Sequence, residues 1–240
     1  MKKLLLVLIM MVPVMIFSQE PAPKKWAVTG ISSLNLNQAS FSYWTAGGTN
    51  SLAFSALGKY SANYKQNKFS WNNNLNLMYG MVKNQGESLK KSEDLIELIS
   101  VAGLDLNPKW SVTGYMSFRT QFANAWDKDN DSIKVSQLLS PGYLTLSPSV
   151  RFKPNDNFYI LISPATAKFT FVTNQDLADK GSFGVTPAEY DSVGNQWVKV
   201  TDGDNMLLYL GPFLEAYYKK TVVKNLTYET RFNVLYTLLN

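Results

Sequence analysis

The chain has 240 residues, of which 45% are hydrophobic, 13% aromatic and 17% charged, which is too apolar for a disordered segment and enough for one folded domain. It contains no histidine and no cysteine, which excludes a Ser-His-Asp triad, a cysteine nucleophile, disulfides and the usual zinc, haem and iron–sulfur sites. We therefore expect a protein that is not an enzyme and has no cofactor. The formal net charge of +5 is too small to predict nucleic-acid binding.

Residues 1–18 have the layout of a secretory signal peptide. Two lysines precede an apolar run over residues 4–17, and a polar, proline-containing stretch follows it. This run of 14 residues is short for a membrane-spanning helix, which needs about 20. We predict cleavage after residue 18 and an exported domain over residues 19–240. A permanent N-terminal anchor is the alternative.

The exported part alternates between apolar and polar residues with a period of two, as expected for β-strands with one apolar face. In residues 51–65, for example, Phe54 and Tyr60 belong to the apolar set, and Ser55 and Lys59 to the polar set. Clear alternation also covers residues 71–81, 110–122 and 226–238, and weaker alternation covers 31–43, 93–106, 143–153, 158–171 and 206–220. We therefore predict nine strands. Pro164 in the segment 158–171 predicts a bulge or an irregular stretch there.

Strand length and loop length both favour a membrane barrel. Every predicted strand has at least 11 residues, whereas globular strands average about 5 to 6 and membrane-barrel strands need about 9 to 11. The joints after the even-numbered strands are tight, at Gln66-Asn67, Asn107-Pro108-Lys109, Pro154-Asn155-Asp156 and around Thr221, and the other joints are longer. Short turns at one end and long loops at the other are typical of outer-membrane barrels. The sequence therefore predicts an all-β fold, an antiparallel up-and-down transmembrane β-barrel.

Aromatic residues gather near both ends of the predicted strands. Beside the tight turns they are Tyr64, Phe69, Trp71, Trp110, Phe158, Tyr217 and Tyr218, and near the long loops they are Tyr43, Trp44, Tyr79, Phe122, Trp126, Tyr143 and Phe171. Amphipathic rings prefer the headgroup level of a bilayer, so two belts are expected. The pattern indicates location in the cell outer membrane, with lipid and lipopolysaccharide as partners and further envelope proteins left open.

Several motifs are shared with one group of proteins. The most specific is Gln38 followed by Trp44-Thr45-Ala46-Gly47-Gly48-Thr49-Asn50-Ser51, and the others are Trp71-Asn72-Asn73, Lys91-Ser92-Glu93-Asp94, Phe118-Arg119-Thr120-Gln121-Phe122, Leu139-Ser140-Pro141-Gly142 and Ser163-Pro164. They resemble a Bacteroidetes-type family of exported proteins catalogued only as a domain of unknown function, over about residues 26–184. The resemblance implies an outer-membrane barrel and assigns no activity.

The number of strands conflicts with a closed barrel. Bacterial single-chain barrels have an even number of strands, and nine would leave two strands running the same way at the point of closure. We expect either a C-terminally incomplete chain or one miscounted strand. The resemblance favours a longer relative with about twelve strands.

Nine charged residues are predicted on the face of the sheet that would line a barrel lumen. They are Lys59, Glu93, Glu97, Asp105, Arg119, Arg151, Glu215, Glu229 and Arg231. Mixed charges of this kind either form ion pairs that fill the interior or form a charged constriction that selects solutes. Glu93 and Glu97 are too far apart along one strand, at about 13 Å, for the paired carboxylates of a glycosidase.

Two loop features remain open as sites. The segment Asp127–Asp131 alternates carboxylates as calcium loops do, but it lacks the glycine and glutamate of an EF-hand, so only loose Ca²⁺ binding is considered. Asp131-Ser132-Ile133 and Asp191-Ser192-Val193 resemble the short acceptor of Bacteroidetes-type O-glycosylation. We expect a porin-like small or gated pore, or an envelope-assembly component. The alternative is a soluble, secreted β-sandwich that binds glycans.

Overall fold

The computed structural model describes residues 25–42, 48–127, 130, 132–194 and 196–238. The predicted signal peptide lies outside these residues, as does the segment 43–47 of the most specific motif. None of the described helices is long and apolar enough to cross a membrane.

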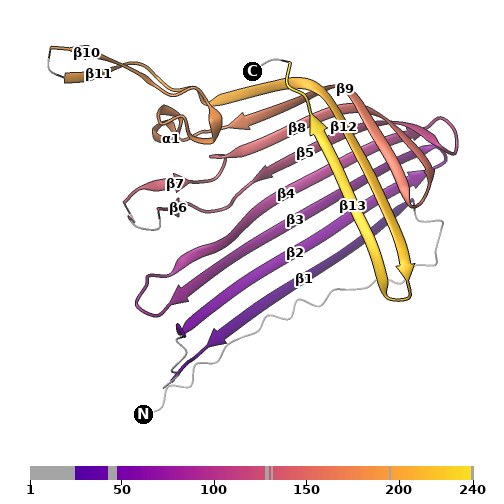
Figure 1. Cartoon of the computed structure of the whole chain (residues 1–240), viewed down its shortest axis with the longest axis horizontal. Coiled ribbons are helices and arrows are strands. Elements are labelled where there is room, and N and C mark those ends of the chain that lie inside the picture. Colours follow the sequence, from indigo (N-terminus) through magenta and orange to yellow (C-terminus); the bar gives the residue numbers. More distant parts are fainter. Residues whose placement is uncertain (1–24, 43–47, 128–129, 131, 195, 239–240) are drawn as a thin grey trace.

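One antiparallel sheet of nine strands forms the body of the protein, and each strand pairs with the next one along the chain (Figure 1). The strands are β1 (Trp26–Ala39), β2 (Ser51–Gln66), β3 (Phe69–Asn84), β4 (Lys90–Asp105), β5 (Trp110–Thr120), β8 (Gly142–Asn155), β9 (Phe158–Phe171), β12 (Met206–Val223) and β13 (Leu226–Leu235). All nine predicted strands are confirmed. The strand containing Pro164 has the predicted bounds.

The sheet is strongly twisted and curled, and the strand direction changes progressively from β1 to β13 (Figure 1). The outer edges of the sheet are β1 and β13, and these two strands do not pair with each other. The described strands therefore form an all-β, antiparallel meander but no closed barrel.

Prolines mark the level at which the ladder is irregular. The register between β8 and β9 shifts around Pro148, and the register between β9 and β12 shifts around Pro212, at the level of Pro164 on β9. A proline has no N–H to donate to a neighbouring strand, so such positions are tolerated at bulges. The irregularity that Pro164 predicts is therefore present.

Connections alternate in length as the sequence predicts, with shifts at the strand ends. The hairpins after β2, β8 and β12 are two-residue turns over residues 67–68, 156–157 and 224–225, and residues 106–109 join β4 to β5. The β3–β4 loop is only residues 85–89, shorter than expected, because both strands extend towards it. We call the end of the sheet that carries the four tight connections the turn end, and the other the loop end.

The loop end carries four short strands and two short helices that the sequence pattern did not predict. They are β6 (Ala125–Trp126), β7 (Lys134–Ser136), α1 (Gln175–Asp179), the 3-10 helix η1 (Ser182–Gly184), β10 (Glu189–Val193) and β11 (Gln196–Thr201). The only cluster of buried hydrophobic residues in the described chain is here, where Val172, Leu177, Ala178 and Val185 pack together with Phe183 and Leu207 against them.

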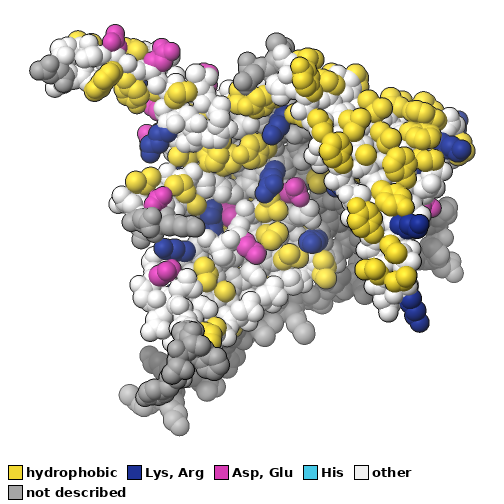
Figure 2. Space-filling model, in the orientation of Figure 1, with side chains coloured by type: hydrophobic (Ala, Val, Ile, Leu, Met, Phe, Trp, Pro, Cys, Tyr) yellow, Lys and Arg dark blue, Asp and Glu magenta, His cyan; other side chains and the backbone are white. Residues whose placement is uncertain are grey.

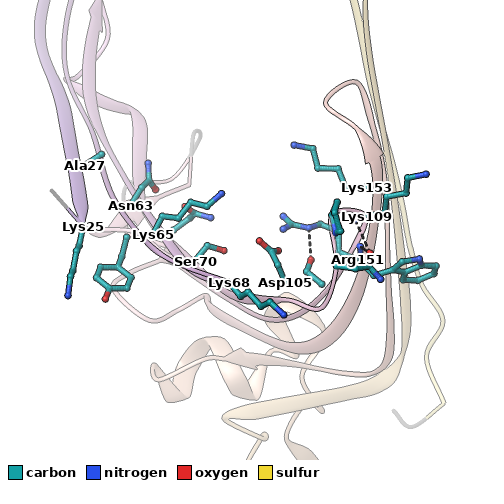
Figure 3. Close-up of a pocket in the computed structure, with 16 residues that line it drawn as sticks. Lys25, Ala27, Asn63, Lys65, Lys68, Ser70, Asp105, Lys109, Arg151 and Lys153 are labelled. Atoms are coloured by element: carbon teal, nitrogen blue, oxygen red, sulfur yellow. Dashed lines mark hydrogen bonds between the residues drawn. The ribbon is translucent and has the colours of Figure 1, made fainter. Parts of the chain in front are cut away.

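The two faces of the sheet differ in chemistry. The pairing register aligns Lys59, Asn76, Glu97 and Arg119 across β2 to β5, and the alternate positions align Tyr64 with Trp71 and Leu98 with Phe118. We call the face that carries Lys59, Asn76, Glu97 and Arg119 the concave face. Figure 3 shows Lys65, Ser70 and Asp105 of this face within the curve of the sheet. The other is the convex face. Figure 2 shows charged side chains over the visible face of β2–β5 and hydrophobic side chains over β12 and β13.

Gly211 of β12 lies directly beneath the segment that follows β13. The backbone N–H of Tyr236 donates to the carbonyl oxygen of Pro212 at 3.0 Å, and the N–H of Leu238 donates to that of Leu210 at 2.8 Å. A Cβ at Gly211 would lie 1.7 Å from the carbonyl oxygen of Tyr236, which is inside any allowed contact. The close approach therefore requires glycine.

We expect Gly211→Ala to displace residues 236–238 from β12. Losing two backbone hydrogen bonds, worth roughly 0.5–1.5 kcal/mol each, should accelerate amide hydrogen exchange of Tyr236 and Leu238 by about tenfold or more. Gly114→Ala is the matched control, because a Cβ at Gly114 meets no heavy atom within 4 Å. Equal exchange rates in the two variants would contradict the close packing.

Candidate functional site

All nine predicted lumen charges lie on the concave face. The observed strand pairings place them at alternating positions whose side chains belong to that face. One row runs across Lys59, Asn76, Glu97 and Arg119, and a second row, nearer the turn end, includes Asp105, Arg151 and Glu215. The remaining members are Glu93 on β4 and Glu229 and Arg231 on β13. The face assignment agrees with the sequence pattern.

Three of these charges form hydrogen bonds with uncharged neighbours. The amide of Asn76 donates to Glu97 Oε2 at 2.9 Å, Arg151 Nε donates to Ser111 Oγ at 3.1 Å, and Tyr159 OH donates to Glu215 Oε1 at 2.5 Å. Among the described residues no two of the nine form an ion pair with each other. Glu229 pairs with Lys219 at 3.8 Å, outside the predicted set.

At the turn end, the concave face forms a pocket of about 700 Å³ (Figure 3). Its walls come from β1 to β5 and β8 together with the tight turns between them. Seven of its lining side chains are ionisable as cations or carboxylic acids: Lys25, Lys65, Lys68, Lys109, Arg151, Lys153 and Asp105. Six of the seven are basic, so this turn-end pocket is strongly cationic.

The tight turns explain why these lysines meet. Asn67 adopts a left-handed conformation with φ of 51°, which closes the β2–β3 hairpin between Lys65 and Lys68. The side chain of Asn107 accepts hydrogen bonds from the N–H groups of Lys109 and Trp110, both at 3.0 Å, and so shapes the β4–β5 turn. The four tight connections share the turn end of the sheet, and the lysines near three of them line the pocket.

Sequence reasoning placed Asp105 and Arg151 on this face but missed the five lysines. Four of them lie near tight turns and Lys25 precedes β1, and at such positions a charged residue is ordinarily only solvated. The available signal was the repetition of lysine beside three successive tight turns.

An aromatic cluster covers the convex face at the same end. The ring centroids of Trp26 and Tyr64 are 5.1 Å apart, those of Trp26 and Trp71 5.7 Å, and those of Tyr64 and Phe69 6.0 Å. Trp110 stands 4.7 Å from Phe152 farther along the sheet. Tyr217 lies near the same end, as the sequence predicts, but on the concave face, where it pairs with Arg231.

At the loop end, Asp94 joins β4 to the segment after β5. Its carboxylate accepts hydrogen bonds from the backbone N–H of Phe122 at 2.6 Å and of Ala123 at 2.9 Å, and it pairs with Lys91 Nζ at 2.7 Å. The side chain of Asp94 is only 3% exposed. Lys91 also donates to Gln121 and to the carbonyl of Ala123. This buried pair ends β5 at Thr120, two residues before the predicted end.

The β10–β11 ribbon is tied to α1 by an ion pair. Lys199 Nζ lies 2.8 Å from Asp179 Oδ2 and 2.6 Å from Asp202 Oδ1. The hydrogen bond from Lys199, followed by those from Gln175 and the backbone of Gly203, lowers the pKa of Asp179 from 3.8 to about 2. Hydrogen bonding to Asp179 and Asp202 raises the pKa of Lys199 above its ordinary value.

The two loop motifs give no assembled site. Residues 128, 129 and 131 of the acidic segment lie outside the described residues, as does the aspartate of the first glycosylation motif. Within the described ranges no group of three or more acidic side chains is placed to hold a metal ion. Asp191 and Ser192 of the second motif are exposed on β10.

The fold defines the chain as an all-β protein, built on one antiparallel meander with a polar concave face and a cationic pocket at one end. Residues 36–126 match the model of a family described as "Protein of unknown function (DUF3078)". This match supports the resemblance to a family known only as a domain of unknown function. No curated protein and no solved structure matches the chain.

We expect Asp94→Asn to loosen residues 121–127 and 132–141. Asparagine cannot accept both backbone hydrogen bonds and neutralise Lys91, and a buried cation without its partner costs about 3–5 kcal/mol. Limited proteolysis should therefore cut this segment much faster in the variant. Asp156→Asn is the matched control, because its ion pair with Lys153 is exposed and should matter little. A segment equally resistant in both variants would refute the role of Asp94.

We expect the β10–β11 ribbon to detach in acid. A carboxyl whose pKa is lowered on folding contributes stability above its ordinary pKa, here 3.8, and loses it as the pH falls towards the folded value of about 2. The raised pKa of Lys199 keeps the pair charged at neutral pH and lets it weaken only in strong base. A fluorophore on Val193→Cys should lose anisotropy between pH 4 and pH 2.

Asp179→Asn supplies the control for this titration. The variant should show low anisotropy already at neutral pH, with no further fall in acid. If the parent and the variant gave the same pH curve, Asp179 would not be the group that holds the ribbon.

Proposed function

We propose that this protein is an integral outer-membrane protein whose curled sheet is the wall of a transmembrane β-barrel. In this proposal the convex face contacts lipid and the concave face contacts water. The protein is not an enzyme and acts as a small or gated pore or as an envelope-assembly component. The observation that carries the proposal is the separation of polar and apolar side chains onto opposite faces of the sheet, which is clearest on β2, β3, β5 and β13.

The exposure of large hydrophobic residues supports the lipid contact. Phe54 is 42% exposed, Trp71 40% and Phe232 59%, and all three lie on the convex face. Among the described residues, the buried hydrophobic ones are Leu161, Val172, Leu177, Ala178 and Val185. A water-soluble domain of this length buries most of its apolar surface in a core. A bilayer provides the missing apolar environment.

The dimensions and the two ends of the sheet support the same proposal. The main strands have 10 to 18 residues, which meets or exceeds the roughly 9 to 11 that a tilted strand needs to cross the hydrocarbon. The Trp26, Tyr64 and Trp71 cluster lies where an interfacial belt would lie. The tight turns would then face the periplasm and the long loops the outside.

The chemistry of the concave face supports a water-filled interior. Lys59 and Arg119 are exposed on it, and the buried side chains of the same face on β5, β8 and β9 are mainly hydroxyls, including Thr113, Ser149 and Thr166. A second sheet packed on an apolar face, which a soluble glycan-binding sandwich requires, is not found among the described residues. These features favour the membrane barrel over that alternative.

Site-directed spin labelling tests the proposal directly, because the chain contains no cysteine. Labels at Phe54→Cys and Phe232→Cys should collide with oxygen dissolved in the bilayer. Labels at Ser55→Cys and Asn233→Cys, the neighbouring positions on the concave face of the same two strands, should instead collide with a water-soluble nickel complex. We expect the ratio of the two accessibilities to invert between the faces.

The paired positions serve as controls for one another, since each pair shares a strand and a depth in the sheet. Convex labels shielded from oxygen, in protein that stays monodisperse without detergent, would support the soluble sandwich. Oxygen contact at both faces would exclude a water-filled interior and with it the pore.

A further inference from the structure

The turn-end pocket has a charge imbalance that its own residues do not correct. Six basic side chains and Asp105 line it, as described above. Lys153 is paired with Asp156, whose side chain is 95% exposed and lies outside the pocket. Lys25, Lys65, Lys68 and Lys109 make no ion pair with any described residue. The pocket therefore holds an excess of positive charge.

The backbone brings like charges together in this pocket. The N–H of Lys65 donates to the carbonyl oxygen of Lys25 at 2.9 Å, and the N–H of Lys153 donates to that of Lys109 at 2.7 Å. Like charges opposite each other on neighbouring strands destabilise a sheet. All four of these lysines line one pocket, and Figure 3 shows Lys65 within the curve of the sheet. An anion bound in the pocket would offset part of this positive charge.

Arg151 supplies a directed donor group. Its Nε donates a hydrogen bond to Ser111 Oγ at 3.1 Å, and Ser111 is only 3% exposed. This hydrogen bond restrains the position of the guanidinium group. Its terminal nitrogens make no hydrogen bond to another described residue. Arginine presents a planar set of donors that matches the oxygens of phosphate and carboxylate groups. Asn63 and Asn72 add uncharged donors to the same wall.

The size of the pocket limits the ligand. A volume of about 700 Å³ falls within the range of small-molecule sites, roughly 300–1,000 Å³. A single carboxylate would neutralise only one of the six cations, whereas a diphosphate concentrates several negative charges within a few ångströms. The geometry points to a compact, multiply charged phosphate-bearing ligand.

We propose that the turn-end pocket binds a phosphate-bearing anion with at least two negative charges, either a soluble phosphate compound or the headgroup of a lipid. Arg151 contacts the phosphate oxygens directly, and the surrounding lysines neutralise the remaining charge. The proposal does not depend on the sheet lying in a membrane, since every residue of the pocket belongs to one sheet end.

Calorimetric titration of the full chain in detergent with inorganic pyrophosphate tests this assignment. We expect saturable binding that weakens as salt is raised, because the contacts are mainly between charges. The triple variant Lys65→Gln, Lys109→Gln, Arg151→Gln should raise the dissociation constant at least tenfold. Lys220→Gln is the control, because it removes a lysine at the same end of the sheet but outside the pocket.

Competition identifies the chemistry and the source of the anion. Displacement of pyrophosphate by short-chain phosphatidic acid, but not by phosphatidylcholine, would assign the site to a lipid headgroup, and displacement by a soluble nucleoside diphosphate alone would assign it to a free phosphate compound. Tighter binding of citrate than of pyrophosphate would overturn the phosphate assignment. Absence of binding at low salt, or equal affinity in the triple variant and the Lys220→Gln control, would overturn the site itself.

A failed titration leaves the membrane proposal intact, because the spin-label experiment measures different residues. Circular dichroism of the triple variant should match that of the parent, since the three side chains are exposed or half-buried and only Arg151 makes a side-chain hydrogen bond. With its fold preserved, a loss of affinity reports on the pocket alone.

Discussion

The backbone ladder of the nine-stranded sheet is the constraint on which the other features depend. Because side chains alternate with a period of exactly two residues, a slip of one residue in any pairing would move every side chain of that strand to the other face. The observed register keeps Lys59, Glu97 and Arg119 on one face and Tyr64 and Phe118 on the other. The polarity of each face is thus a consequence of register.

The same ladder makes the two ends of the sheet chemically different. In a meander, every second connection lies at the same end of the sheet. The residues that flank the tight turns are therefore neighbours at that end. At the turn end this gathers lysines around one pocket, whereas at the loop end it brings Asp94 beneath the backbone of Phe122 and Ala123. One end exposes unbalanced positive charge, and the other buries a satisfied carboxylate.

The alternation in the sequence was sufficient to predict the strands, because each is long enough to show its period several times. Even the strand with Pro164 was predicted with correct bounds, since the bulge changes the register without ending the strand. The end of β5 was misplaced because it depends on Asp94, 28 residues away from Phe122. The short elements of the loop end have too few residues for periodicity, and they form by packing around Leu177 and Ala178.

The candidate site was less predictable for a related reason. Sequence pattern assigns residues to a face, so the nine concave charges could be placed on it, but it gives neither their partners nor their level along the strands. The expected ion pairs were inferred from charge alone, whereas Glu97 and Arg151 bind Asn76 and Ser111. The pocket lysines are far apart in the sequence. They come together only because the pairing of β1 to β5 and β8 places the tight turns at one end of the sheet.

The direction of the strands places a geometric condition on any closed wall. With nine antiparallel strands, β1 and β13 run the same way, so they cannot join each other by antiparallel pairing. Unpaired backbone groups within a bilayer cost several kcal/mol each, which makes an open edge in lipid unfavourable. A closed antiparallel barrel that includes this sheet therefore contains an odd number of further strands between β13 and β1. The even strand counts of bacterial barrels follow from this same condition.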